Sequence, residues 1–241
     1  MWLSLRLAIR RWHGAIKVFK NGESNVVKLI WSTPDADAVM GYCARVSNPE
    51  NQDNAEVGGL LRYCARNGHW SVFEMASACL EINTTRDIAR QILRHRSFSF
   101  QEFSQRYADV SLLGDMIERE CRMQDTKNRQ NSLECADEAT EQWWATSQEL
   151  VYMKASQLYK RALEAGIAKE QARALLPEGL TPSRMYVSGT IRSWIHFLQV
   201  RTDQATQKEH RLIAEAALEV LRGVAPITIN ALFDRSSDSG C

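Results

Sequence analysis

The sequence has little net charge, no long apolar run and none of the commonest dinucleotide-binding patterns. Its 241 residues carry a formal net charge of +1, which argues against a strongly basic nucleic-acid-binding protein. No run of eighteen apolar residues occurs, so we expect no membrane-spanning helix. No Gly-x-Gly-x-x-Gly pattern occurs either, which argues against a Rossmann cofactor site.

The six cysteines form no Cys-x-x-Cys pair and have no histidine nearby at the spacing of metal ligands. We therefore predict no metal site and interpret the cysteines as free thiols of a cytoplasmic protein. They are Cys43, Cys64, Cys79, Cys121, Cys135 and Cys241. A hydrophobic content of 44% allows a substantial buried core at this length.

The stretch 94–107, RHRSFSFQEFSQRY, concentrates more potential chemistry than any other part of the sequence. It carries three arginines, one histidine and one glutamate, interleaved with three phenylalanines. Guanidinium groups bind phosphate through paired hydrogen bonds, so this composition indicates a site for a phosphorylated ligand. A solvated basic helix end is the alternative interpretation, because runs of charge usually lie on the surface.

Hydrophobic periodicity predicts both strands and helices, and we expect an α+β fold with a small, mostly antiparallel sheet flanked by helices. The predicted strands span 26–31, 73–84 and 184–188, and extended chain follows from Ser97. The predicted helices span 36–45, 54–67, 85–96, 149–165 and 205–221. The polar segment 110–149 is interpreted as an interrupted helix pair or a surface insertion.

Three further expectations concern the long helix and the two ends of the chain. In the helix over 149–165, we expect Leu150, Met153, Leu158 and Leu163 to face inward. Residues 26–233 are expected to form one catalytic domain. The basic segment 1–25 is interpreted as a flexible extension, and 234–241 as a disordered tail.

The stretch 94–107 resembles the signature RHRxxSxNxxSxR of the flavin-dependent thymidylate synthases. Six of its seven specified positions match, and Gln101 stands where the signature has asparagine. The matching residues are Arg94, His95, Arg96, Ser99, Ser104 and Arg106. Such a dense match over thirteen residues is far more specific than a lone glycine pattern.

Other segments are similar to elements of the same family. ARVS at 44–47 and ARALLP at 172–177 match directly, and NGHWSVFEM at 67–75 resembles HGHxSxFEH, with Met75 replacing the last histidine. The segment 190–211 resembles the late helix and the following SHAQxEI element. There Thr190 and His196 stand where asparagine is commoner, and Ala205 replaces the histidine, while Gln207 and Glu209 are retained.

The resemblance implies the reductive methylation of dUMP to dTMP. Methylenetetrahydrofolate would supply the carbon, FAD would carry electrons and NADPH would reduce the flavin. It also implies a homotetramer whose active sites are shared between subunits. The sequence lacks a Pro-Cys-His box of the kind found in the folate-only thymidylate synthases, which fits a mechanism without a cysteine nucleophile.

The resemblance also implies roles for individual residues. Arg201 is the expected catalytic residue, since an arginine at the edge of the uracil ring favours its anionic form. His69 is expected in the folate or flavin region. The expected dUMP-binding residues are Gln91, Arg94, Glu102, Ser104, Arg106, Arg173 and Arg201. The expected FAD-binding residues are Ser71, Arg94, His95, Arg96, Glu102, Thr190, Arg192 and His196.

Two alternatives remain open at this stage. The same fold could transfer a different one-carbon group to dUMP, such as a hydroxymethyl group. This alternative is motivated by the departures at Gln101, Met75, Thr190, His196 and Ala205. The chain could instead be a non-enzymatic nucleic-acid-binding protein that uses Arg94, Arg96 and Arg106, although its near-neutral charge argues against this.

Overall fold

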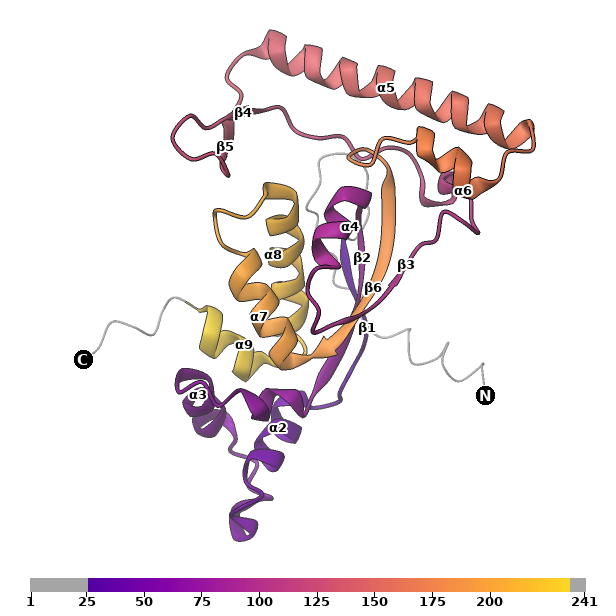
Figure 1. Ribbon diagram of the computed structural model, residues 1–241. Coiled ribbons are helices and arrows are strands. Elements are labelled where there is room, and N and C mark those ends of the chain that lie inside the picture. The colour runs from indigo at the N-terminus through magenta and orange to yellow at the C-terminus, as the bar shows by residue number, and fades with distance from the viewer. Residues whose placement is uncertain (1–25, 235–241) are drawn as a thin grey trace.

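The computed structural model describes residues 26–234, so the segment 1–25 and residues 235–241 lie outside the described part (Figure 1). Its helices are α2 (Ala36–Ala44), α3 (Gly58–Arg66), α4 (Arg86–Ile92), α5 (Glu138–Glu164), α6 (Lys169–Ala172), α7 (Ile191–Arg201), α8 (Lys208–Arg222) and α9 (Pro226–Phe233). Its strands are β1 (Val27–Ser32), β2 (Ser77–Thr85), β3 (Ser99–Glu102), β4 (Arg122–Gln124), β5 (Ser132–Glu134) and β6 (Pro182–Thr190). Short 3₁₀ helices are η2 (Pro49–Asn51), η3 (Trp70–Glu74), η4 (Val110–Leu113) and η5 (Arg173–Leu175).

A four-stranded sheet with the order β1-β2-β6-β3 forms the frame of the molecule. Every neighbouring pair of strands in it is antiparallel, which confirms the predicted α+β class. The central strands β2 and β6 pair along their whole length, from Ser77 with Thr190 to Thr85 with Pro182. The helix α4 therefore begins at one end of this pair of strands, and α7 begins at the other.

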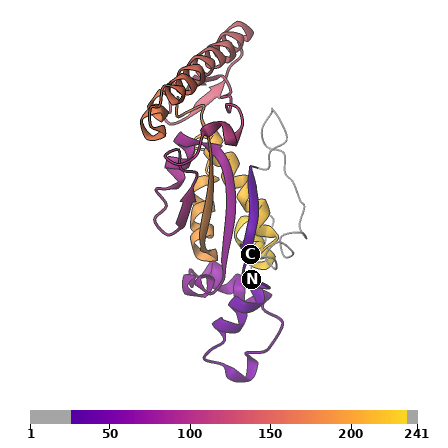
Figure 2. The same ribbon diagram turned by 90° about the vertical axis from the view of Figure 1, so that its right-hand side faces the viewer.

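The two faces of the sheet differ in burial. Leu80 and Ile82 on β2 are fully buried together with Val187 and Met185 on β6, and this face packs against α7 and α8. The side chains of the opposite face alternate with these, and there Tyr186 is 38% exposed. Figure 2 shows the sheet from its side, with α5 beyond one end and α2 and α3 beyond the other. Within residues 26–234 this face is thus less completely covered than the other.

Several predicted elements have different limits in the structure. The helix predicted over 85–96 ends at Ile92, and the extended chain predicted from Ser97 includes β3, the edge strand of the sheet. The strand predicted over 73–84 begins only at Ser77, because the residues before it form η3, which buries Phe73. The helix predicted over 54–67 starts at Gly58. The other predicted strands and helices outside 110–165 are confirmed to within a few residues.

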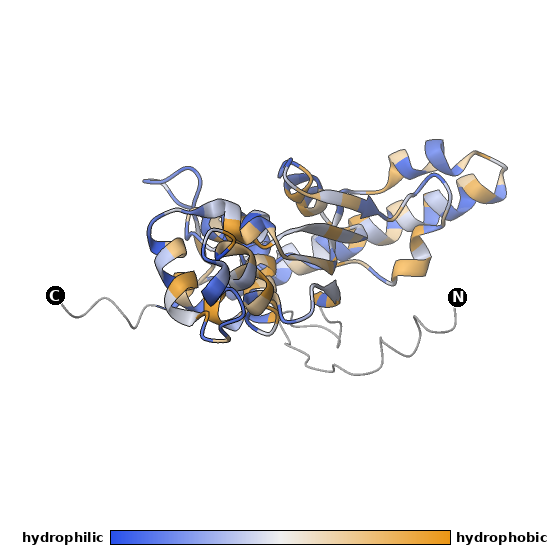
Figure 3. Cartoon of the chain, turned by 90° about the horizontal axis from the view of Figure 1, so that it is seen from below, coloured by the Kyte–Doolittle hydropathy of each residue, from blue (hydrophilic) through white to orange (hydrophobic). Residues whose placement is uncertain are grey.

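The segment 110–165 differs most from its prediction. A two-stranded hairpin of β4 and β5 replaces the interrupted helix pair, and one long helix, α5, begins at Glu138. Leu150, Met153 and Leu158 are 58%, 56% and 38% exposed, so the prediction that they face inward is wrong for the single chain. Figure 3 shows apolar and polar residues mixed on the helices at its right, which include α5. None of the helices in residues 26–234 combines the length and apolar character that crossing a membrane requires.

The five cysteines within residues 26–234 are free thiols, as predicted, and Cys241 lies outside the described residues. Cys64 and Cys79 are buried, and burial raises the pKa of both thiols. A raised pKa lowers the fraction of reactive thiolate at neutral pH. These two cysteines therefore act as small apolar core residues.

Phe98 packs into the core and so anchors the stretch 94–107. Its ring is only 8% exposed and lies 4.6 Å from the Trp194 ring, measured between centroids. Gly189 on β6 makes room for this ring, because a Cβ atom there would lie 2.4 Å from Phe98 Cδ1. The Ser193 hydroxyl donates to the Ser97 carbonyl at 3.2 Å. The turn between α4 and β3 is thereby held against the start of α7.

We predict that Gly189→Ala lowers the free energy of unfolding by about 1–3 kcal/mol, because the added methyl group overpacks the site of the Phe98 ring. Chemical denaturation of both proteins at neutral pH measures this difference. Gly59→Ala on α3 is the matched control, since a Cβ there has nothing within 4 Å. An unchanged stability of the Gly189 variant would contradict the assigned packing.

Candidate active site

A cluster of arginine and histidine side chains forms where the turn after α4 meets the end of α7. Arg201 donates from Nε to Nε2 of His95 at 2.8 Å. The half-buried His95 ring also lies 5.1 Å from the ring of Phe197, between centroids. Burial and the nearby Arg201 charge lower the pKa of His95 to about 4. His95 is therefore neutral at physiological pH, and its Nε2 lone pair is free to accept from Arg201.

Arg94 and Arg201 bring two positive charges close together in this cluster. Burial, and then the charge of Arg94, lower the pKa of the Arg201 guanidinium. No hydrogen bond or ion pair within residues 26–234 uses the guanidinium group of Arg94 or the terminal nitrogen atoms of Arg201. Unpaired guanidinium groups of this kind suit an anionic ligand.

Gln91 on α4 connects this cluster to the start of α8. Its Nε2 donates to Oε1 of Gln207 at 2.8 Å, and its Oε1 lies 3.2 Å from Nδ1 of His210. His210 is fully buried, and burial with the nearby Arg201 charge lowers its pKa to about 3. The His95 and His210 rings are 6.4 Å apart between centroids. Gln91, His95, Arg201 and His210 therefore belong to one connected group, the α4–α7 group.

A second set of predicted residues gathers at the far end of β3. Glu102 accepts from Ser183 at 2.7 Å and pairs with Arg86 at 3.4 Å. Arg106 pairs through Nε with Glu170 at 3.1 Å. Arg173 donates to the Glu170 carbonyl at 3.2 Å, so Arg106 and Arg173 share this neighbour. With Ser104, whose Oγ is 3.4 Å from the Arg106 amide, these residues form the β3 group.

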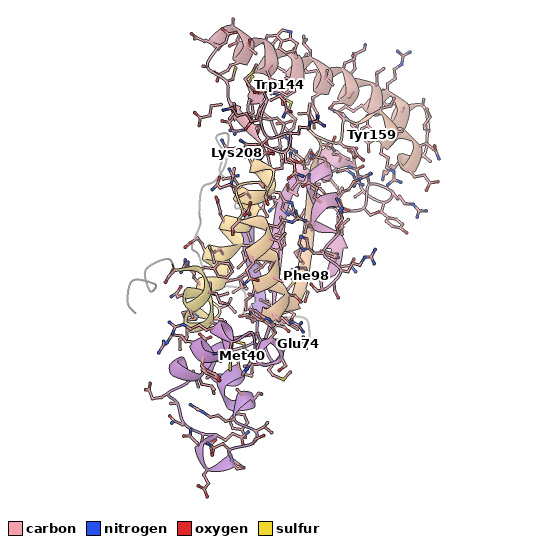
Figure 4. All side chains as sticks on the ribbon, turned by 60° about the vertical axis from the view of Figure 1, so that its left-hand side comes forward. Met40, Glu74, Phe98, Trp144, Tyr159 and Lys208 are labelled. Carbon is pink, nitrogen blue, oxygen red and sulfur yellow. The ribbon has the colours of Figure 1, made fainter. Side chains whose placement is uncertain are left out.

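The remaining predicted residues lie along the beginning of α7. Thr190 caps this helix, since its hydroxyl accepts from the Ser193 amide at 3.3 Å. Arg192 pairs with Glu74 of η3, which Figure 4 labels near the start of α7. His196 follows Arg192 by four residues and is exposed like it, so both occupy one face of the helix. Figure 4 places Phe98 beside the same helix.

Three predicted residues take no part in these contacts. Ser71 is exposed on η3, and His69, also exposed, stacks edge-on against Tyr63 at 5.6 Å between centroids. Arg96 is exposed, and no hydrogen bond or ion pair within residues 26–234 uses its guanidinium group. Within the described residues, no hydrogen bond or ion pair joins the α4–α7 group directly to the β3 group.

Sequence analysis did not identify Arg119, whose largely buried side chain joins several elements. It pairs with Asp87 at 2.7 Å and with Glu209 at 3.4 Å, and it donates to the Gly179 carbonyl at 3.0 Å. Its own backbone carbonyl accepts from Trp144 Nε1 at 2.9 Å. The polar segment around Arg119 gave no periodic signal that could have singled it out.

Arg119 borders a cavity of about 380 Å³ between α4, α8 and the β4–β5 hairpin. Figure 4 shows Lys208 at the end of α8 that faces α5, where Trp144 lies. The lining carries charges of both signs, and most of them pair with one another. It consists of Asp87, Arg119, Glu120, Cys121, Arg122, Ser132, Trp144, Gly179, Gln207, Lys208 and Glu209.

His210 was also missed, although the sequence contains a signal for it. It begins the apolar face of α8, which continues with Ile213, Ala214 and Ala217, all fully buried. A histidine at a core-facing position of a helix calls for a buried hydrogen-bond partner. The ARVS arginine, Arg45, proves to be structural, since its Nη2 donates to the Glu56 carbonyl at 2.7 Å.

The chain is similar to several known proteins. Residues 28–227 match the family described as thymidylate synthase complementing protein. The chain is 52% identical over 198 residues to a probable flavin-dependent thymidylate synthase of Paramecium bursaria Chlorella virus 1, covering 82% of this chain and 90% of the relative. It is 53% identical over 199 residues to the flavin-dependent thymidylate synthase of Synechocystis, covering 81% and 89%.

A solved structure shares the fold. The UMP/dUMP methylase PolB from Streptomyces cacaoi, bound with 5-Br dUMP, aligns with a TM-score of 0.72 and 29% identity. The alignment covers 85% of this chain and 93% of PolB. The same arrangement of sheet and helices therefore occurs in a protein with a bound pyrimidine nucleotide.

The two neutral histidines predict how stability depends on pH. In the folded protein the pKa values of His95 and His210 are about 4 and about 3, below the ordinary value of 6.5. At a pH between these values and 6.5, the unfolded chain therefore binds more protons than the folded protein. We expect the free energy of unfolding to fall as the pH drops from 6.5 to 4, by up to about 1.4 kcal/mol per pH unit for each histidine. Denaturation at pH 7, 6 and 5 measures the slope. His210→Phe should reduce it, and an unchanged slope would contradict the assignment.

Proposed function

Because this chain belongs to the family of flavin-dependent thymidylate synthases, we propose that it converts dUMP and methylenetetrahydrofolate to dTMP and tetrahydrofolate. NADPH is the proposed reductant, FAD the proposed cofactor and the cytoplasm the proposed location. The observation that carries the proposal is the α4–α7 group with the adjacent Arg94: the histidines are neutral, and terminal nitrogen atoms of Arg94 and Arg201 have no partner within residues 26–234. Such a site favours an anionic nucleotide.

We assign dUMP binding to residues of both groups. Arg94 and Arg201 have guanidinium nitrogen atoms without a partner within residues 26–234, while Arg106 contacts the Glu170 carboxylate and Arg173 the Glu170 carbonyl. A phosphate at the arginine pair would replace the contact with Glu170, because a doubly charged anion attracts guanidinium groups more strongly than a single carboxylate. Gln91, Glu102 and Ser104 supply the neutral and acidic contacts of the proposed site.

Arg201 is the proposed catalytic residue. Carbon C5 of the uracil ring becomes nucleophilic when negative charge builds up on the ring, and a neighbouring guanidinium stabilises that charge. An arginine keeps its proton at any working pH, so Arg201 acts as a fixed charge and hydrogen-bond donor. The bond to His95 holds its Nε and leaves the terminal nitrogen atoms for the ring edge.

The cationic side chains on α7 and on the turn after α4 suit an anionic cofactor. Arg96 and Arg192 are exposed, and Arg192 has only Glu74 as its charged partner within residues 26–234. His196 lies on the same face of α7 as Arg192. With Ser71, Arg94, His95, Glu102 and Thr190, these residues form the proposed FAD site, and His69 lies in the proposed folate or flavin region. The flavin supplies the redox chemistry, and the cationic side chains favour its reduced, anionic form.

A homotetramer is supported by the surfaces that the single chain leaves open. Trp31 and Tyr186 are 48% and 38% exposed on the strands, and Leu150 and Met153 are more than half exposed on α5. Exposed apolar side chains that gather on a surface typically become buried in association with other chains. Sharing of sites between subunits would also bring the β3 group of one chain to the α4–α7 group of another.

The experiment that tests the function is a visible absorption spectrum of the purified protein with FAD, followed by titration with dUMP. Flavin bands that shift on addition of dUMP are expected, since both ligands would share one site. Incubation with methylenetetrahydrofolate and NADPH should then yield a product with the mass of dTMP. A hydroxymethyl product would favour the alternative one-carbon transfer, and a protein that binds no flavin would contradict the proposal.

We predict that Arg201→Lys lowers kcat about 100-fold, because the loss of one preorganised donor to developing charge typically costs this much or more. A lysine keeps the charge but lacks the Nε donor that bonds to His95. FAD binding should persist. Arg66→Lys at the end of α3 is the matched control and should retain full activity.

We further predict that Leu150→Glu dissociates the tetramer, because it places a charge within the exposed apolar stripe of α5. Light scattering should give the mass of four chains for the natural protein and a smaller mass for the variant. Glu149→Gln, at the neighbouring exposed position, serves as a control. A variant that remains tetrameric would exclude this stripe as an interface.

A further inference from the structure

Three side chains in a row, those of Glu209, Gln207 and Gln91, connect Arg119 to His210. Arg119 pairs with Oε2 of Glu209, and Gln207 donates to the same oxygen at 2.9 Å. Gln207 in turn accepts from Gln91 at 2.8 Å, and Gln91 Oε1 faces His210 Nδ1 at 3.2 Å. The row therefore runs from a fixed charge at the cavity to a buried imidazole beside Arg201.

Only one arrangement of donors satisfies every member of this row. Glu209 pairs with Arg119 and a carboxylate group only accepts, so Gln207 must turn its amide hydrogens towards it. The oxygen of Gln207 then faces Gln91, which must present its NH₂ group there and its oxygen to His210. The reverse arrangement would place the amide oxygen of Gln207 against the Glu209 carboxylate, an unfavourable contact between two acceptors.

His210 terminates the row as a donor. The oxygen of Gln91 only accepts, so the proton of the neutral imidazole must reside on Nδ1. The other ring nitrogen, Nε2, is buried and has no hydrogen-bond partner within residues 26–234. Burial of such an unpartnered atom costs stability. A phenylalanine or other apolar residue would avoid that cost, so packing alone does not explain a histidine here.

We propose that His210 is a positioning residue of the nucleotide site, which fixes the amide orientation of Gln91 by donating from Nδ1 to its Oε1. This inference rests on the proposed function, in which Gln91 contacts dUMP. Gln91 is half buried, and only one amide hydrogen and one oxygen lone pair remain for a ligand. Without His210 the Gln91 oxygen would lose its donor, only the contact with Gln207 would hold the amide, and dUMP binding would have to order it further.

The first test reads the protonation of His210 without any nucleotide. Long-range proton–nitrogen NMR spectra of the full-length protein with ¹⁵N-labelled histidine distinguish the two neutral tautomers. The His210 signal is identified by its loss in His210→Gln. The expected result at pH 7 is a neutral ring with the proton on Nδ1. A proton on Nε2, or a charged ring, overturns the inference whatever the enzyme binds.

The second test measures dUMP affinity by calorimetry on the FAD-loaded enzyme. His210→Phe keeps a ring of similar shape and should raise the Kd for dUMP about five- to tenfold, as expected for one lost hydrogen bond. His210→Gln retains an amide donor and should recover at least half of this loss. FAD affinity should stay within about twofold in both variants, since FAD does not depend on Gln91 in the proposed site.

Two controls separate positioning from general loss of stability. Ile213→Val removes a methyl group from the same buried face of α8 and should leave dUMP affinity unchanged. In the variant Gln91→Leu, the further change His210→Phe should add little, because His210 acts through Gln91. Equal losses of dUMP and FAD affinity, or additive losses in the double variant, overturn the inference.

The two tests also distinguish this inference from the proposed function. A natural enzyme that binds no dUMP overturns the proposed function and the nucleotide role of His210 with it. A natural enzyme that binds dUMP normally, while His210→Phe binds it equally well, overturns only the role of His210.

Discussion

The burial of Phe98 is the constraint on which the candidate site depends. Its ring occupies the space above Gly189 and beside Trp194, at the corner where β6 continues into α7. A chain that must place this ring in the core has to leave the helical path soon after Ile92. The polar residues on either side of Phe98 are therefore held at the surface of the corner. His95, three residues earlier, meets Phe197 and Arg201 of the same helix that holds the ring.

Residue chemistry and local pattern predicted much of the fold, while the contacts between distant residues were not predictable. The sequence pattern identified both β6 and α8, and the resemblance to the family identified Arg94, His95 and Arg201 as functional candidates. The bond between His95 and Arg201 spans 106 residues, and it exists because β2 and β6 pair along their full length. No local pattern encodes such a pairing. Nor could periodicity show that Leu150 is exposed, because an apolar face for a partner chain resembles a core face.

The division of the predicted residues into two groups has a structural cause. The α4–α7 group lies between two helices on the covered side of the sheet, whereas the β3 group extends from the edge strand towards α6. A single chain offers no hydrogen bond or ion pair between the groups among its described residues. Trp31 and Tyr186 on the sheet and Leu150 on α5 are exposed within residues 26–234, and these surfaces are suited to bring further copies close. The exposed apolar residues of α5, which the sequence predicted to face inward, thus also support the proposed sharing of sites between subunits.

The electrostatics of the α4–α7 group favour neutral histidines among arginines. Arg94 and Arg201 already repel one another, and a charged His95 would add a third positive charge to a half-buried site. A protonated imidazole would also lose the Nε2 lone pair that accepts from Arg201, so that the guanidinium would no longer be held. Burial against Phe197 prevents this protonation at physiological pH. The positive charge that attracts an anionic ligand therefore comes from the arginines. The neutral histidines orient polar neighbours instead: His95 accepts from Arg201, and His210 donates to Gln91 in the proposed arrangement.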